Sequence, residues 1–166
     1  MTHTTRKRWT VRLRRLFGAK PCRVQVAALP WRKVDNAVQV MLITSRDTGR
    51  WVLPKGWPEG VEKLHDAAAR EAVEEAGLTG AVSAVEIGRY FYRKARRSGD
   101  DVQCEVHVFP LEVDRVADDW DEKRKRTRKW VSATDAARLV NEPDLGEVIA
   151  HFCANPRQVL ARSQAA

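Results

Sequence analysis

The stretch that decides the fold covers residues 56–78 and reads GWPEGVEKLHDAAAREAVEEAGL. Its first part, with residue 55 before it, is rich in glycine and proline, which is typical of a loop. Residues 62–76 predict a helix that ends at Gly77, because glycine readily adopts the left-handed conformation found after a helix C-terminus. The apolar stripe expected to pack this helix against a sheet consists of Leu64, Ala68, Ala72 and Ala76.

Three glutamates occupy another face of this predicted helix. Glu71, Glu74 and Glu75 have the spacing i, i+3 and i+4, so they project from one side, and Arg70 is placed to pair with Glu74. Adjacent carboxylates repel one another unless they are solvated, paired or bound to cations, and oxygen ligands suit hard ions such as Mg²⁺. Taken alone, such a row is more often a solvated acidic face than a metal site.

The spacing of the whole stretch separates these two interpretations. Gly56 is followed by five residues and Glu62, then by seven residues and Arg70-Glu71, and an apolar residue after Gly77 completes the pattern. At every specified position it resembles the Nudix box, GX5EX7REUXEEXGU, in which U is apolar. The resemblance implies an α/β fold, namely an α/β/α sandwich with a mixed β-sheet that carries a catalytic loop and helix.

The same resemblance implies roles for residues of the box. Gly56 offers its carbonyl to a metal, and Glu71, Glu74 and Glu75 bind divalent ions, with Mg²⁺ expected and Mn²⁺ as the alternative. Arg70 orients the glutamates and joins them in the catalytic set. The implied reaction is hydrolysis of a phosphoanhydride bond by activated water, in which metal ions neutralise phosphate charge. The family does not share one general base, so that role stays open among the glutamates.

The rest of the chain predicts one domain. Residues 1–20 are expected to be a basic N-terminal tail, residues 21–155 the Nudix domain, and residues 156–166 a C-terminal tail. Segments rich in apolar and β-branched residues predict strands at 22–31, 37–44, 51–53, 81–92, 102–113 and 130–131. Capping residues predict two further helices, one from 132 or 134 to 140 and one from 143 to about 154.

Basic residues are unevenly distributed along this chain of net charge +8. Residues 1–20 hold seven basic side chains and no acidic one, whereas the remainder holds 23 basic and 22 acidic side chains. The tail is expected to be a disordered arm, with an amphipathic helix on RNA or a membrane as the alternative. No apolar run reaches the roughly 20 residues of a membrane span and no secretory signal is evident, so we expect a cytoplasmic location.

The sequence on either side of the box indicates the substrate class. RWVLPK at residues 50–55, and Trp120 followed by a basic run and Trp130, resemble diphosphoinositol polyphosphate phosphohydrolases, whose relatives also cleave diadenosine polyphosphates. A polyphosphate requires several Lys and Arg side chains around the metal site. The residues expected to bind such a substrate are Ser45, Arg46, Lys55, Arg93, Arg126 and Arg128.

Two alternatives stand beside a hydrolase of small polyphosphates. The basic tail and loops favour an RNA 5′-end pyrophosphohydrolase, but no RNA-binding motif is evident, so nucleic acid is the less favoured partner. A catalytically silent ligand sensor on the same fold is disfavoured by the intact acidic row, because adjacent carboxylates are costly without a metal. The sequence leaves the oligomeric state and the number of metal ions open.

Overall fold

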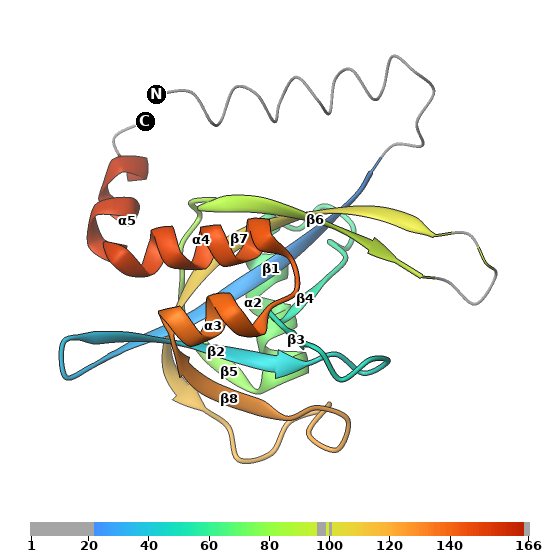
Figure 1. Ribbon diagram of the computed structural model, residues 1–166, viewed down its shortest axis with the longest axis horizontal. Coiled ribbons are helices and arrows are strands. Elements are labelled where there is room, and N and C mark those ends of the chain that lie inside the picture. Colours follow the sequence, from blue (N-terminus) through green and yellow to red (C-terminus); the bar gives the residue numbers. More distant parts are fainter. Residues whose placement is uncertain (1–21, 96–98, 100, 165–166) are drawn as a thin grey trace.

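One mixed β-sheet with helices on both of its faces forms the molecule (Figure 1). The computed structural model describes residues 22–95, 99 and 101–164. The strands are β1 (Arg23–Val34), β2 (Ala37–Thr44), β3 (Trp51–Val52), β4 (Lys55–Gly56), β5 (Leu78–Val82), β6 (Gly88–Lys94), β7 (Val102–Val116) and β8 (Arg128–Ser132). The helices are α2 (Leu64–Ala76), α3 (Ala133–Leu139), α4 (Pro143–Ala154) and α5 (Pro156–Gln164).

The long strand β1 lies at the centre of the sheet. It forms an antiparallel hairpin with β2, and both residues of the turn, Asp35 and Asn36, adopt positive φ angles that these two residue types tolerate. On its other side β1 runs parallel to β7. The strand order is β3-β2-β1-β7-β5, with β4 on β1, β6 on β7 and β8 on β2. The sheet is mixed because the β1–β7 pair is parallel whereas β1–β2 is antiparallel.

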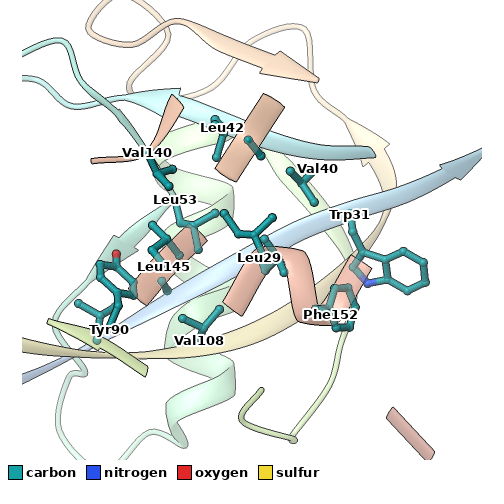
Figure 2. Packing of buried hydrophobic residues seen from close by; sticks show 14 of the residues in the cluster. Leu29, Trp31, Val40, Leu42, Leu53, Tyr90, Val108, Val140, Leu145 and Phe152 are labelled. Carbon is teal, nitrogen blue, oxygen red and sulfur yellow. The ribbon is translucent and has the colours of Figure 1, made fainter. Parts of the chain in front are cut away.

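Side chains alternate between the two faces of β1 and therefore enter two cores. Leu29 and Trp31 point to the face covered by α3 and α4, where Phe152 packs edge-on against Trp31 (Figure 2). Val26 and Ala28 point to the opposite face, which the alanines of α2 cover. Figure 1 shows α3 and α4 on the near side of the sheet and α2 on the far side. The predicted fold class, an α/β/α sandwich with a mixed sheet, is confirmed.

One predicted strand is wrong. Residues 81–92 belong to two strands, β5 and β6, with a turn between them in which Ser83 Oγ accepts a hydrogen bond from Val85 N. Both strands pair with β7, β5 along its C-terminal part and β6 along its N-terminal part. Because both segments lie along the same neighbour, the apolar pattern continues across the break and hides it.

Other boundaries shift for local reasons. Helix α2 begins at Leu64 rather than at Glu62, since the Glu62 carboxylate accepts a hydrogen bond from Glu59 N and belongs to the loop. Strand β4 is not predicted from the sequence, because a strand of two residues is too short to show a periodic pattern. The segment expected to be a C-terminal tail contains α5, from which Val159 and Leu160 pack against the core. Among the described residues no helix has both the length and the apolar character to cross a membrane.

Candidate active site

Helix α2 carries the predicted acidic row and lies close to the sheet. Its fully buried alanines are Ala67, Ala68, Ala72 and Ala76. Their small side chains bring the helix backbone near β1, so that side chains on its flank reach the loop that precedes it. Gly77 ends the helix with a φ of 64°, and its N–H bonds to Val73 O at 2.9 Å, as expected for a C-terminal glycine.

Gly56 and Glu71 meet at a point where no side chain fits between them. Strand β4 places Gly56 beside Val26 of β1, and the Glu71 side chain is only 11% exposed. A Cβ atom on Gly56 would lie 2.1 Å from Glu71 Oε1, far inside van der Waals contact. Only glycine therefore lets the loop backbone approach this carboxylate. Burial raises the pKa of Glu71, although the Arg70 guanidinium opposes the shift.

Arg70 connects the loop to the acidic face of α2. Its Nη2 donates to Trp57 O at 3.0 Å and to Glu62 Oε1 at 2.9 Å. Its Nη1 donates to Glu71 Oε1 at 2.9 Å and lies 3.5 Å from Glu74 Oε1. One guanidinium thus contacts a loop carbonyl and three carboxylates, an arrangement suited to the orienting role expected for this residue.

Glu75 faces a different part of the same loop. Its Oε2 accepts a hydrogen bond from Lys55 N at 2.9 Å, and its Oε1 pairs with the Arg126 guanidinium. Burial raises the pKa of Glu75, and these contacts oppose the shift. Glu74 is the outermost of the three, with 46% of its side chain exposed compared with 12% for Glu75.

Glu122 joins this site, although the sequence does not single it out. Its carboxylate pairs with Arg126 and lies 3.1 Å from Arg46 Nη1. Arg126 also donates to Thr44 O at 2.9 Å, so its side chain is almost fully buried between Glu75 and Glu122. No signal in the sequence could have identified Glu122, because its segment is highly charged throughout and has no periodicity.

Three of the six residues expected to bind substrate lie around Glu75. Lys55 and Arg126 contact Glu75 directly, and Arg46 pairs with Glu122, which in turn pairs with Arg126. The Lys55 ammonium lies 5.0 Å from the centre of the Tyr92 ring, and burial lowers the pKa of this lysine. Nothing in the sequence marks Tyr92 as a site residue, because it lies in an apolar segment that predicts a strand.

Ser45 and Arg93 contact residues other than the glutamates. The Ser45 hydroxyl lies 2.5 Å from Thr48 Oγ1, within the turn between β2 and β3. The Arg93 side chain is 65% exposed. Its neighbour Lys94 has its ammonium 5.7 Å from the centre of the Trp57 ring. On this strand, Lys94 rather than Arg93 therefore faces the loop of the site.

Arg128 is directed to the end of α2 instead of to the carboxylates. It donates to Ala76 O and to Ala117 O, both at 2.6 Å, and its guanidinium lies 3.9 Å from the centre of the Trp120 ring. These contacts use its donors to satisfy backbone carbonyls and place a cation at a helix C-terminus. The basic tail predicted at residues 1–20 lies outside the described residues.

The donor groups of the site fit a hard divalent ion. In the part of the chain that the structure describes, no three acidic, histidine or cysteine side chains already form a metal-binding group. The guanidinium groups of Arg70 and Arg126 lie against Glu71 and Glu75 instead. The glutamates nevertheless supply carboxylate oxygens, and the loop backbone at Gly56 lies very close to one of these carboxylates. Carboxylate oxygens are the ligands that Mg²⁺ and Mn²⁺ prefer.

The fold and this site define a class of protein, an α/β/α sandwich with a glutamate-rich loop and helix. A family model, the NUDIX domain, matches residues 23–152. The chain therefore belongs to the Nudix family, which confirms the resemblance seen in the box.

Known relatives agree with this assignment. Nudix hydrolase 21, chloroplastic, from Arabidopsis thaliana is 33% identical over 131 residues, or 76% of this chain and 64% of that protein. Diphosphoinositol polyphosphate phosphohydrolase 3-alpha from Mus musculus is 27% identical over 128 residues, or 76% and 74% of the two chains. The crystal structure of a C. elegans Ap4A hydrolase has a TM-score of 0.57 at 21% identity and covers 80% of this chain and 97% of that one. The chain thus spans less than two thirds of the plant relative.

Proposed function

We propose that this chain is a hydrolase that cleaves a phosphoanhydride bond with a divalent ion, Mg²⁺ or in its place Mn²⁺. The ligands would be the Gly56 carbonyl and the carboxylates of Glu71, Glu74 and Glu75. The observation that carries the proposal is the approach of Gly56 to Glu71, which leaves no room for a Cβ atom. The approach brings the loop backbone at Gly56 against a carboxylate, and backbone carbonyls and carboxylates are the kinds of oxygen ligand that a hard ion binds.

The side chains of the site support this chemistry. A bound ion supplies positive charge that offsets the charge of the phosphates and of the leaving group. Arg70 holds Glu71 and the loop in one geometry, which keeps the ligands aligned. Glu75, whose pKa is raised by burial, is suited to accept a proton from the attacking water, and Glu71 shares that property. Either residue is a candidate for the general base.

The substrate that we infer is a highly anionic small molecule, such as a diphosphoinositol polyphosphate or a diadenosine polyphosphate. Arg46 and Lys55 provide donors for phosphate oxygens close to Glu75. The mouse relative and the nematode structure carry these two substrate classes in their names. A cytoplasmic location is also part of the proposal, whereas the plant relative is named chloroplastic.

A panel of substrates tests the proposal. The protein is incubated with Mg²⁺ and, separately, with a diphosphoinositol polyphosphate, diadenosine tetraphosphate, a nucleoside triphosphate, a sugar nucleotide and 5′-triphosphorylated RNA. We expect turnover of at least one of the first two and loss of turnover in chelator. Turnover of RNA alone would favour the pyrophosphohydrolase alternative, and folded protein that turns over nothing would favour the silent sensor.

A further inference from the structure

Two aromatic side chains near the loop of the site lie against basic side chains. The Arg23 guanidinium lies over the Trp57 ring, 4.2 Å from its centre, and the Lys94 ammonium lies 5.7 Å from the same centre. The Lys55 ammonium lies 5.0 Å from the centre of the Tyr92 ring. These distances are within the range of a cation–π interaction. Strand β1, strand β4 and strand β6 thus each bring one cation to an aromatic ring.

The two rings and their cations belong to one surface. Tyr92 and Lys94 are two positions apart on β6, and Arg23 and Gln25 are two positions apart on β1. Residues two positions apart in a strand point to the same face of the sheet. The Tyr92 hydroxyl donates a hydrogen bond to Gln25 Oε1 at 2.5 Å, which joins the two pairs. Arg23, Lys55 and Lys94 therefore form a single basic patch.

The charge of the basic patch is not neutralised by the carboxylates that the structure describes. Within residues 22–95, 99 and 101–164, no ion pair joins the side chain of Arg23, Lys55 or Lys94 to an acidic group. The Arg126 guanidinium, in contrast, already pairs with Glu122. Like charges that are held close together repel one another unless an anion lies between them. The basic patch therefore has its charge available for a bound anion.

Trp57 connects the basic patch to the acidic helix. Its carbonyl oxygen accepts a hydrogen bond from Arg70 Nη2 at 3.0 Å, and its ring carries Arg23 and Lys94. It also directly follows Gly56, the residue whose backbone approaches Glu71. The backbone of this one residue is thus held by the acidic site, while its side chain holds two of the three cations next to that site.

We propose that Trp57 is a positioning residue that holds Arg23 and Lys94 where they bind the phosphates of the substrate that lie beyond the cleaved bond. The inference rests on the proposed function and deepens it, because it assigns a place to the phosphates that are not hydrolysed. Long basic side chains lose conformational freedom when they bind an anion, and a ring that already restrains them reduces this loss. The patch therefore favours substrates with many phosphates.

The test measures the binding of inorganic tripolyphosphate by calorimetry in chelator, so that it depends on neither a metal nor turnover. The variants are Trp57→Leu, which removes the ring, and Trp57→Tyr, which keeps an aromatic face. Both are also compared in a background that carries Arg23→Gln and Lys94→Gln. Trp130→Leu is the matched control, since the Arg32 guanidinium lies 4.1 Å from the centre of the Trp130 ring in a similar pair elsewhere on the sheet. Thermal melts establish that each variant is folded.

We expect Trp57→Leu to weaken tripolyphosphate binding about fivefold, which is the scale of one cation–π interaction, and Trp57→Tyr to stay within about twofold of the unmodified protein. In the background without the two cations, Trp57→Leu should have no further effect, because the ring acts through them. Trp130→Leu should change the affinity by less than about twofold.

Two results would overturn the inference. One is an unmodified protein that does not bind tripolyphosphate, or that binds it as tightly as folded Trp57→Leu does. The other is an equal loss from Trp57→Leu with and without the two cations, since the ring would then act on the loop alone. Failure to hydrolyse any member of the substrate panel would refute the proposed function and leave the binding result intact.

Discussion

Gly56 and Glu71 are complementary, because the carboxylate of Glu71 occupies the space in which any other residue at position 56 would place its Cβ atom. The relationship joins the loop to the helix across 15 positions of the chain. It explains in physical terms why a glycine begins the acidic stretch, since neither a turn nor a positive φ requires one here.

The first prediction concerns the effect of replacing Gly56 on activity. Gly56→Ala should lower kcat/KM by about 100-fold, because the methyl group must displace Glu71 by an ångström or more. The measurement is steady-state hydrolysis together with a thermal melt. The control is Gly60→Ala in the same loop, where a Cβ atom has open space but φ is +54°. That variant should lose about 1 kcal/mol of stability and keep its activity. Equal activity in the two variants would count against the role of the close approach.

Arg70 provides a second prediction. Arg70→Lys keeps the charge but loses the fork that contacts Trp57 O, Glu62 and Glu71. Metal affinity, measured by calorimetry with Mg²⁺, should fall roughly 10- to 100-fold. Arg115→Lys, at an exposed position, should bind Mg²⁺ as the unmodified protein does. An Arg70→Lys variant with unaltered affinity would show that the positive charge alone suffices.

A substitution at Arg128 distinguishes a structural role of this residue from a role in substrate binding. Arg128→Ala should reduce the free energy of unfolding by about 1–3 kcal/mol, because it leaves the Ala76 and Ala117 carbonyls without their donor. KM should stay within about twofold of its original value, since the donors of this guanidinium are used by the two backbone carbonyls. Lys129→Ala, its exposed neighbour, should change neither quantity. A raised KM at undiminished stability would instead support the substrate-binding role expected from the sequence.

The buried carboxylate of Glu71 should make stability depend on pH and metal. Burial raises its pKa above the ordinary value of 4.5, so the folded state holds the proton more tightly than the unfolded state. The stability gained by protonation is present below pH 4.5 and is lost as the pH rises through the folded pKa. In chelator, Glu71→Gln should therefore gain Tm relative to the unmodified protein as the pH increases over this range.

Added metal should make the unmodified protein more stable than Glu71→Gln near neutral pH. Mg²⁺ should raise the Tm of the unmodified protein, because the ion binds the folded state, and should raise that of Glu71→Gln much less. Melting curves with and without Mg²⁺ at several pH values provide the measurement. A variant that is less stable than the unmodified protein at every pH in chelator would contradict the assigned effect of burial.

The acidic helix and its loop could be predicted from the sequence because their determinants are local. Spacings of three and four residues place Glu71, Glu74 and Glu75 on one face, and Gly77 marks the helix end. Segments rich in apolar and β-branched residues likewise located most strands. The break between β5 and β6 escaped prediction, since both pair with one strand and the apolar pattern continues across it.

The contacts of the basic residues were harder to predict, because the composition of a segment does not specify which way each side chain points. Arg126 and Arg128 are two positions apart, yet one pairs with Glu75 and the other donates to the Ala76 carbonyl at the end of α2. Glu122 lies 76 positions from Arg46, so their contact leaves no trace in any local pattern. Only the folded chain shows which charges surround the glutamates and which support the helix.

The most direct test of the central claim is the rate of phosphoanhydride hydrolysis by Glu75→Gln and the unmodified protein, each with Mg²⁺ and with chelator. The substrate is whichever member of the panel is turned over. We predict that chelator abolishes turnover, that Mg²⁺ or Mn²⁺ restores it, and that folded Glu75→Gln is slower by at least about 100-fold, the scale of losing one aligned catalytic group. Turnover that persists in chelator, or a Glu75→Gln rate equal to that of the unmodified protein, would contradict a metal-dependent hydrolase built on this acidic helix.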